Sequence, residues 1–392
     1  MVIRVPAFAA ALALTASAGL GCMFSTKPYR GPKSDHFNGE KFTNTHPPED
    51  RPSEAGEARN ARDDGFFSIL GSLLRWKLFG DAPEPWPGWV DIEPTPPPPE
   101  RVGVGDLRIT FVNHATVLVQ MDGINILTDP VWSERVGPVS WAGPARVHAP
   151  GIKFEDLPPI DLVLISHNHY DHLDLPTLKR LFQRNAPRIG AGLGTARFLR
   201  SQGVPRARDF DWWESRRITK HVRITAVPAQ HFSMRGVGDQ DTMLWVGFVI
   251  EGPAGRVYFA GDTGYGAHFA KIRNRLGPVT VALLPIGAYR PRWFMAPVHI
   301  DPFEAVRAHL DLGAEVSLGI HYGTFDQADE GRTEPVTELR AALAGANVFA
   351  PRFWVLGPGE GRHVHEAIAE IERMEAARAT AAPRTRWPSR AD

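Results

Sequence analysis

Short apolar runs bounded by Gly, Pro or polar residues recur from about residue 106 onward. They include "LRITFVNHATVLVQM", "DLVLIS", "RITAVPA", "RVYFAGD", "VALLPIG" and "EVSLGIHYG". Their length and their β-branched and aromatic content indicate β-strands. Helical periods lie between some of them, as in "DLPTLKRLFQR" and "DPFEAVRAHLDLG", where proline near the start or glycine after the end marks the caps. Strands interspersed with such helices predict an α/β (α+β) domain over 106–360, with sheets covered by helices.

The N-terminal arm, residues 23–105, has a different pattern. Residues 23–63 are rich in Pro and charged residues without a sustained apolar period, which predicts an extended or partly disordered stretch. Residues 66–79, within "DGFFSILGSLLRWKLFGD", predict a helix that is apolar over most of its circumference. This helix either packs on the main domain or faces lipid or an acyl chain. The prolines of 83–100 indicate a linker or a wrapped arm.

Both ends of the chain differ from the main domain. Residues 1–22 combine an early Arg4 with an alanine-rich apolar stretch, which is typical of a signal peptide. "AGLGC" resembles a bacterial lipoprotein cleavage box, and Cys22 would then carry the lipid. The competing "ASA", ending at Ala18, would instead release a periplasmic or secreted protein. We expect export and anchoring to a cell envelope membrane through Cys22. Residues 361–392 predict a C-terminal helix and a basic tail.

The amino-acid composition limits the possible partners and metal ligands of the chain. The 392 residues suffice for one large domain or two ordinary ones. Lys plus Arg and Asp plus Glu both number 44, so no overall basic field indicates a nucleic-acid partner. A single cysteine excludes an intramolecular disulfide framework and a cysteine-rich zinc finger. Any metal must therefore be held by carboxylates and by some of the 15 histidines.

The strongest chemical signal is the histidine cluster of "DLVLISHNHYDH", which directly follows an apolar strand. In extended backbone, His167 and His169 project to the same side. Asp171 and His172 lie just past a turn. This set offers two imidazoles to one cation, and a carboxylate with an imidazole to a second cation. A metal site explains the cluster better than a polar turn does, because several packed histidines need a cation or water to stay hydrogen-bonded.

Further ligands are expected at other strand ends. "TAVPAQHFS" ends a strand at His231, "VYFAGDTGYG" ends one at Asp262 and "VSLGIHYGTF" ends one at His321. Each repeats the order of an apolar strand, one ligand-type residue and then small or polar residues. Taken singly, each fits an ordinary polar residue at a strand end. Together with the 167–172 run they make seven ligands for two metals.

These motifs resemble a known family. "HNHYDH", "AQH", "AGDTGY" and "GIHYGTF" are similar to the metallo-β-lactamase superfamily, and more narrowly to its branch of N-acylphosphatidylethanolamine-hydrolysing phospholipase D enzymes and their bacterial relatives. The segments 34–44, 129–138 and 286–295 also resemble that branch, so the similarity covers about 34–360. The resemblance implies an αββα sandwich with the metals at one edge of the sheets.

The resemblance also implies roles for individual residues. One Zn²⁺ is held by His167, His169 and His231, the other by Asp171, His172 and His321, and Asp262 bridges them. Other divalent metals fit the same ligands. Asp171, Asp262 and His321 are the expected catalytic residues, and Asp129 would orient the ligands. His114 and His299 are expected near the mouth, although His299 fits a helix cap or a core role equally well.

The implied activity is hydrolysis of a phosphodiester. A hydroxide shared by the metals would attack phosphorus and release phosphatidic acid and an N-acylethanolamine-type alcohol. The alternatives are a zinc lactonase, another phosphodiesterase of the superfamily, or a non-catalytic metal-stabilised lipid-binding lipoprotein. The expected partners are a phospholipid or another small phosphodiester and a membrane surface. The oligomeric state stays open.

Overall fold

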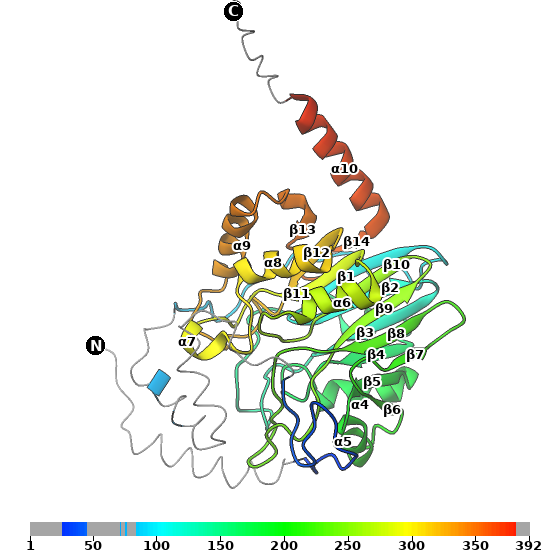
Figure 1. Ribbon diagram of the computed structural model, residues 1–392, viewed down its shortest axis with the longest axis vertical. Coiled ribbons are helices and arrows are strands. Elements are labelled where there is room, and N and C mark those ends of the chain that lie inside the picture. The colour runs from blue at the N-terminus through cyan, green and yellow to red at the C-terminus, as the bar shows by residue number, and fades with distance from the viewer. Residues whose placement is uncertain (1–25, 45–70, 72–74, 77–83, 382–392) are drawn as a thin grey trace, which may run out of the picture.

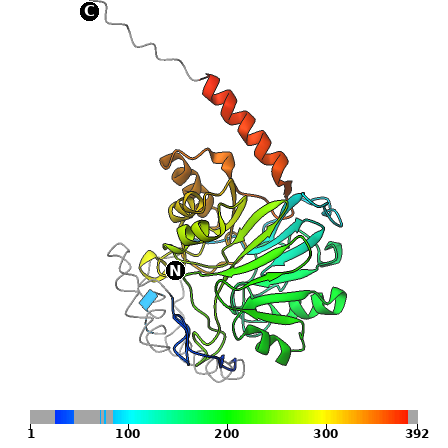
Figure 2. The same cartoon turned by 45° about the vertical axis from the view of Figure 1, so that its right-hand side comes forward.

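Two mixed β-sheets of seven strands each form the centre of the computed structural model (Figures 1 and 2). The structure describes residues 26–44, 71, 75–76 and 84–381. The predicted signal peptide, Cys22 and most of the predicted 66–79 helix lie outside these residues.

The first sheet has the strand order β14-β1-β2-β3-β4-β5-β6. Its strands are β1 (Leu107–Asn113), β2 (Thr116–Met121), β3 (Ile124–Thr128), β4 (Leu162–Ile165), β5 (Arg188–Gly192), β6 (Ala207–Phe210) and β14 (Gly361–His363). β3 to β6 run parallel, whereas β14, β1, β2 and β3 are antiparallel neighbours. The strand β14 lies just beyond the domain boundary predicted at residue 360.

The second sheet has the order β13-β12-β11-β10-β9-β8-β7. Its strands are β7 (Ser215–Arg217), β8 (Arg223–Val227), β9 (Gly247–Gly252), β10 (Gly255–Phe259), β11 (Val281–Pro285), β12 (Val316–Ile320) and β13 (Phe353–Trp354). β10 to β13 run parallel, and β8 points the same way as β10 because each is antiparallel to β9.

Helices cover the outer face of each sheet. Side chains of α4 and α5 pack on the first sheet, and side chains of α6, α8 and α9 pack on the second. The helices are α4 (Leu175–Asn185), α5 (Thr195–Ser201), α6 (His268–Leu276), α7 (Arg292–Met295), α8 (Pro302–Leu312), α9 (Glu334–Gly345) and α10 (Val364–Ala381), with 3-10 turns η3 (Phe154–Asp156) and η4 (Ala350–Arg352). The predicted αββα sandwich is confirmed.

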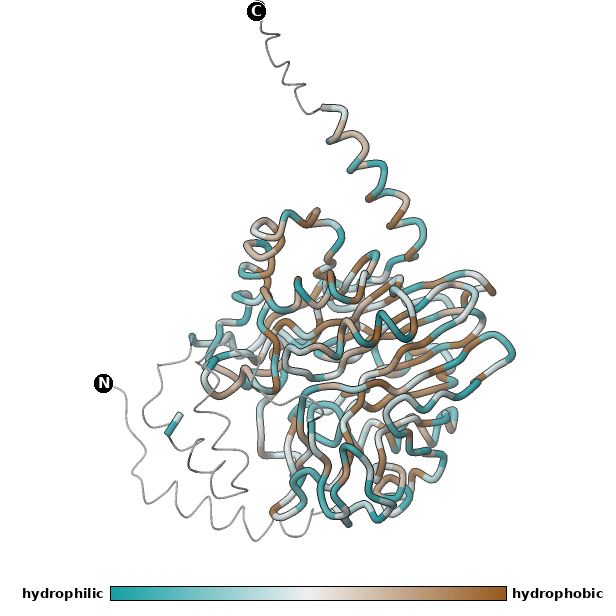
Figure 3. The backbone as a smooth tube through the Cα atoms, in the orientation of Figure 1, coloured by the Kyte–Doolittle hydropathy of each residue, from teal (hydrophilic) through white to brown (hydrophobic). Residues whose placement is uncertain are grey.

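The apolar runs of the sequence are explained by burial on both faces of each sheet. In β4, Leu162 and Leu164 point into the core between the sheets, whereas Val163 and Ile165 point under α4 and α5. The side chains of β11 likewise alternate between the inter-sheet core and the face that α6 and α8 cover. Figure 3 shows the resulting concentration of hydrophobic residues along the strands. A strand buried on both faces lacks the alternation of a half-exposed strand, as its sequence indicates.

The described parts of the N-terminal arm pack on this sandwich. Phe37 and Phe42 are buried in the inter-sheet core, and Phe42 N donates to Asp241 O at 2.8 Å. Residues 84–100 contain no helix or strand, and Gln120 Nε2 donates to Pro99 O at 2.7 Å. Trp76, from the predicted 66–79 helix, is buried in a small cluster that includes Phe294. These contacts place the described parts of the arm on the domain surface.

The C-terminal helix α10 projects from the body of the molecule (Figures 1 and 2). Val364, Ile368 and Ile371 in its first turns are buried in the inter-sheet core cluster. Among the described residues, no helix is long and apolar enough to cross a membrane.

Candidate metal centre

Seven His and Asp side chains converge where strands of both sheets end. The loop after β4 carries four of them, and single residues follow β8, β10 and β12. They are His167, His169, Asp171, His172, His231, Asp262 and His321, the seven residues predicted from the sequence. They meet because the carboxyl ends of β4, β8, β10 and β12 share one edge of the sandwich.

Three imidazoles form the first group. His169 Nδ1 lies 2.8 Å from His167 Nε2 and 3.3 Å from His231 Nε2. Two of these rings are buried, whereas His169 is only half-buried. The half-buried ring marks the more open side of the cluster.

Two carboxylates and two imidazoles form the second group. Asp171 Oδ2 lies 3.3 Å from His172 Nε2 and 3.4 Å from His321 Nε2. Asp262 Oδ2 lies 3.2 Å from each of the same two nitrogens. It also lies 3.9 Å from His167 Nε2 and 3.8 Å from His231 Nε2, so Asp262 stands between the two groups.

The spacing and the unpaired atoms of both groups fit metal ions. Ligand atoms about 2.0–2.1 Å from a tetrahedral Zn²⁺ are separated from one another by about 3.3 Å. Most distances within each group are close to this value. His172 Nε2, His321 Nε2 and Asp262 Oδ1 are buried without a hydrogen-bond partner among the described residues. Buried polar atoms of this kind are costly unless a ligand satisfies them.

A buried carboxylate orients the ligand loop. Asp129 Oδ2 accepts from His172 Nδ1 at 2.6 Å and from Ser166 Oγ at 2.5 Å. Asp129 Oδ1 accepts from the backbone N–H of Ser166 at 2.8 Å. The Ser166 hydroxyl also lies 2.9 Å from His167 Nδ1, so one network holds a ring of each group. His231 is held separately, because its Nδ1 lies 3.0 Å from Val298 O. These contacts leave the ligand nitrogens aimed into the cluster.

Backbone conformation contributes to this arrangement. Asp129, His114 and His321 have φ angles of 30°, 46° and 60°. These values lie in the left-handed region, which L residues occupy at a cost of roughly 1–3 kcal/mol each. Surrounding contacts must therefore hold them, as when His321 N donates to His114 O at 2.8 Å.

The electrostatics of the cluster favour neutral rings in the first group, whereas the carboxylates of the second group raise the pKa of His172 well above its usual value and that of His321 to about 9. Burial alone would raise the pKa of Asp262, but His172 and His321 bring it well below its usual value. Burial, together with neighbouring histidines, holds the pKa of His167 well below its usual value, so its ring is neutral. Burial likewise lowers the pKa of His169 to about 4. Anionic carboxylates and neutral imidazoles are the forms that bind metal.

The two residues predicted near the mouth are buried instead. His114 is 1 % exposed, and its Nε2 lies 3.0 Å from Asp171 Oδ2. His299 is 8 % exposed, and its Nδ1 lies 4.0 Å from Asp262 Oδ2. His299 does not cap α8, because Asp301 forms the capping box there. The loops around the cluster close over both rings, which sequence spacing does not show.

Three polar residues of the site were not predicted from the sequence. Ser166 joins the Asp129 network, Gln327 Nε2 donates to Asp171 Oδ2 at 3.0 Å, and Asn44 pairs with the backbone of His231. Asn44 does lie within the 34–44 segment that carried the family resemblance. Ser166 and Gln327 flank predicted ligand segments, but nothing in their residue types distinguished them.

The fold and the cluster together define an αββα sandwich with a His and Asp site capable of binding metal at one edge. A family model described as "Beta-lactamase superfamily domain" matches residues 124–322, half of the chain. The chain therefore belongs to the β-lactamase superfamily, as the sequence motifs predicted.

Individual relatives agree with this assignment. N-acyl-phosphatidylethanolamine-hydrolyzing phospholipase D 1 of Caenorhabditis elegans is 42% identical over 248 residues, which cover 60% of this chain and 68% of that protein. An uncharacterized protein of Mycobacterium tuberculosis is 41% identical over 247 residues, covering 62% of this chain and 65% of that protein. The match thus spans about two thirds of both relatives.

A solved structure supports the fold. A metallo hydrolase from the archaeon Ignicoccus hospitalis aligns with a TM-score of 0.50 and 23% sequence identity, covering 66% of this chain and 98% of that chain.

Proposed function

We propose that this chain is a zinc-dependent phosphodiesterase that hydrolyses N-acylphosphatidylethanolamine or a similar phospholipid. The observation that carries the proposal is the pair of ligand groups that meet at Asp262. A pair of metal ions that share one ligand suits attack on a phosphodiester, because both attacking and leaving oxygens can be stabilised. The identity to the C. elegans phospholipase D supports the choice of substrate.

We assign the ligands as the two groups suggest. His167, His169 and His231 hold one Zn²⁺, Asp171, His172 and His321 hold the other, and Asp262 contributes to both. Zinc suits a mixed set of imidazoles and carboxylates, and other divalent ions accept the same set less selectively. When bound, two such cations lower the pKa of a shared water and neutralise charge on phosphoryl oxygens.

The chain's own residues position this chemistry. Asp171, Asp262 and His321 meet in the second group, where Asp262 also approaches the first, and they are the proposed catalytic residues. Asp129 fixes the His172 ring by accepting a hydrogen bond from His172 Nδ1. His114 and Gln327 both contact Asp171 Oδ2 at 3.0 Å. We infer that a substrate approaches beside His169 and Tyr170, since both are half-buried whereas the neighbouring ligands are buried.

We further propose that the chain is exported and anchored to an envelope membrane through Cys22. This location would place the metal centre beside phospholipid.

A metal count combined with a substrate screen tests the proposal. We expect two zinc ions per chain and release of phosphatidic acid from an N-acylphosphatidylethanolamine. Removal of metal should abolish the hydrolysis, and added Zn²⁺ should restore it. Faster cleavage of lactones or of simple phosphodiesters than of the lipid would favour those substrates instead. Two bound metals without hydrolysis of any substrate would favour a lipid-binding role.

A ligand variant with a matched control localises the activity. His169→Ala should lower kcat/KM at least about 100-fold, because a ligand that shapes the open side of the site is lost. His365→Ala alters an exposed histidine of α10 and should leave both rate and metal content unchanged. Full activity of His169→Ala would refute the assignment of that residue.

A further inference from the structure

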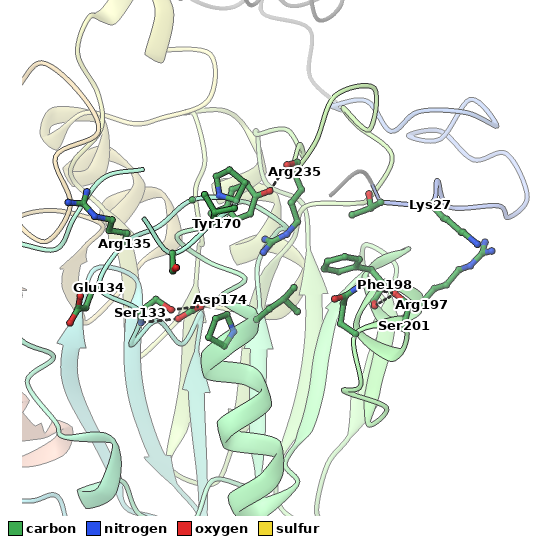
Figure 4. A pocket seen from close by; sticks show the side chains of 18 residues that line it. Lys27, Ser133, Glu134, Arg135, Tyr170, Asp174, Arg197, Phe198, Ser201 and Arg235 are labelled. Carbon is green, nitrogen blue, oxygen red and sulfur yellow. Dashed lines mark hydrogen bonds between the residues drawn. The ribbon is translucent and has the colours of Figure 1, made fainter. Parts of the chain in front are cut away.

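A cavity with a volume of about 750 Å³ lies beside the metal-bearing loop, which follows β4 and carries four of the proposed ligands. Figure 4 shows it above the start of α4, with Tyr170 and Arg235 between Arg135 on one side and Lys27 and Arg197 on the other. Its walls contain none of the seven proposed metal ligands. The proposed ligands therefore lie outside the cavity, although Tyr170 in its wall also borders the side from which we infer that substrate approaches.

The cavity has an excess of positive charge. Four cationic side chains and two carboxylates line it. One of these carboxylates, Asp174, already accepts hydrogen bonds from Ser133 N, Ser133 Oγ and Thr177 Oγ at 3.1, 2.8 and 2.6 Å. Lys27 and Arg197 are exposed at the rim. The charge and its placement favour an anionic ligand.

Arg235 is the most unusual of these cations. Its Nη1 donates to Asn168 O and Leu173 O, both at 2.9 Å, and its guanidinium carbon lies 4.0 Å from the centre of the Tyr170 ring. Among the described residues no carboxylate forms an ion pair with it. Burial lowers its pKa to about 10, which leaves it charged at neutral pH. Asp174, Asp239 and Asp171 lie near enough to raise its pKa but form no ion pair with it, so the partly buried guanidinium can still accept an anion.

The start of the described chain lies at this cavity. Thr26 lines it and is fixed there, because its N and Oγ lie 2.9 and 3.1 Å from Asp239 Oδ2. Cys22 precedes Thr26 by four residues, which span at most about 14 Å of extended chain. A lipid on Cys22, as proposed above, would hold the cavity beside the membrane surface.

We propose that this cavity binds the phosphate group of an anionic glycerophospholipid headgroup. Arg197 and Lys27 meet the phosphate at the rim, and the guanidinium of Arg235 supplies charge from the wall. Leu175, Pro176 and Val139 provide apolar contact for the glycerol and the first carbons of the acyl chains. The site binds a membrane lipid without cleaving it and so goes beyond the proposed hydrolysis, although the membrane setting rests on the proposed anchor.

Vesicle binding tests this proposal with the full metal-loaded chain. The probes are vesicles of phosphatidylcholine alone and of phosphatidylcholine mixed with phosphatidylglycerol. Lys27→Gln combined with Arg197→Gln should weaken binding to the mixed vesicles about tenfold or more. Lys179→Gln combined with Lys220→Gln removes the same charge from exposed positions outside the cavity and should change binding less than about twofold. Arg235 stays unchanged because it also holds the metal-bearing loop.

Two competition experiments identify the ligand. Glycerol 3-phosphate should compete with the mixed vesicles more strongly than inorganic phosphate does, and the double cavity variant should lose this competition. Equal competition by inorganic phosphate would overturn the proposal in favour of a free-phosphate site. Equal vesicle binding by the cavity and control variants would overturn it as well.

Activity distinguishes this site from the metal centre. Hydrolysis of a monomeric soluble phosphodiester should be the same in the wild type and the cavity variant. If the cavity variant lost this hydrolysis, Lys27 and Arg197 would take part in the reaction, and the proposal of a separate lipid site would be overturned. A chain that binds the mixed vesicles through the cavity but hydrolyses nothing would refute the proposed function and leave this inference standing.

Discussion

The side-chain amide of Asn44 pairs with both main-chain polar groups of His231. Asn44 Nδ2 donates to His231 O at 2.9 Å, and Asn44 Oδ1 accepts from His231 N at 3.1 Å. The same oxygen accepts from Trp245 Nε1 at 2.9 Å. Asn44 thereby replaces a neighbouring strand at a point where β8 has already ended.

Loss of this amide should weaken metal binding. Asn44→Ala frees the His231 backbone, and contacts that orient a ligand are worth about 10–100-fold in metal affinity. Competition with a chromophoric chelator measures that affinity. Asn38→Ala is the matched control, because the exposed Asn38 side chain accepts from Glu40 N and Lys41 N in a turn of the same arm. Equal metal affinity in both variants would contradict a positioning role for Asn44.

The convergence of the proposed ligands was easier to predict than most of the residues that orient them. His231 follows an apolar strand, so its sequence context already indicated a ligand. Asn44 lies 187 positions away, and only the packing of the arm brings it to His231. Asp174 shows the same limit. It stands at the N-cap position of α4, where a carboxylate commonly accepts from a helix N–H, but it accepts from the hydroxyls of Ser133 and Thr177 instead.

At the scale of elements, the segment 26–44 is fastened to the domain by a buried histidine. His36 Nδ1 lies 2.6 Å from Asp35 Oδ1, and His36 Nε2 lies 2.7 Å from Asp211 Oδ1. The ring also stacks on Trp212, with 4.4 Å between ring centres. Burial alone would lower the pKa of His36, but the hydrogen bonds to Asp211 and Asp35 outweigh it and raise the pKa.

The contribution of His36 to stability should therefore depend on pH. Because the pKa of His36 is higher in the folded than in the unfolded protein, protonation of His36 stabilises the fold. This stabilisation is complete below the unfolded-state pKa of about 6.5, and it is lost as the pH rises through the folded-state pKa. His36→Gln should lower the melting temperature most at about pH 6 and progressively less toward pH 9. His365→Gln, at an exposed position of α10, is the control. A melting difference for His36→Gln that stays constant with pH would contradict this view.

For the whole molecule, the sandwich was predictable because its apolar strands and intervening helices leave few other ways to bury both faces of a sheet. The placement of the N-terminal arm was harder to predict from the sequence, because residues 84–100 follow the surface without regular structure. The proposed metal ligands connect these scales. Four of them follow β4 in the first sheet, and His231, Asp262 and His321 follow strands of the second.

Metal should accordingly join the two sheets and stabilise the entire fold. A ligand present at 100 times its Kd stabilises the native state by about 2.7 kcal/mol. For a domain of this size that corresponds to a rise in melting temperature of roughly 5–10 °C. Chelation should remove this rise, and added Zn²⁺ should restore it. His169→Ala combined with His321→Ala removes one ligand from each group, so its melting temperature should respond little to chelator or to Zn²⁺. A wild-type melting temperature unaffected by chelation would show that the two sheets are held together without the metals.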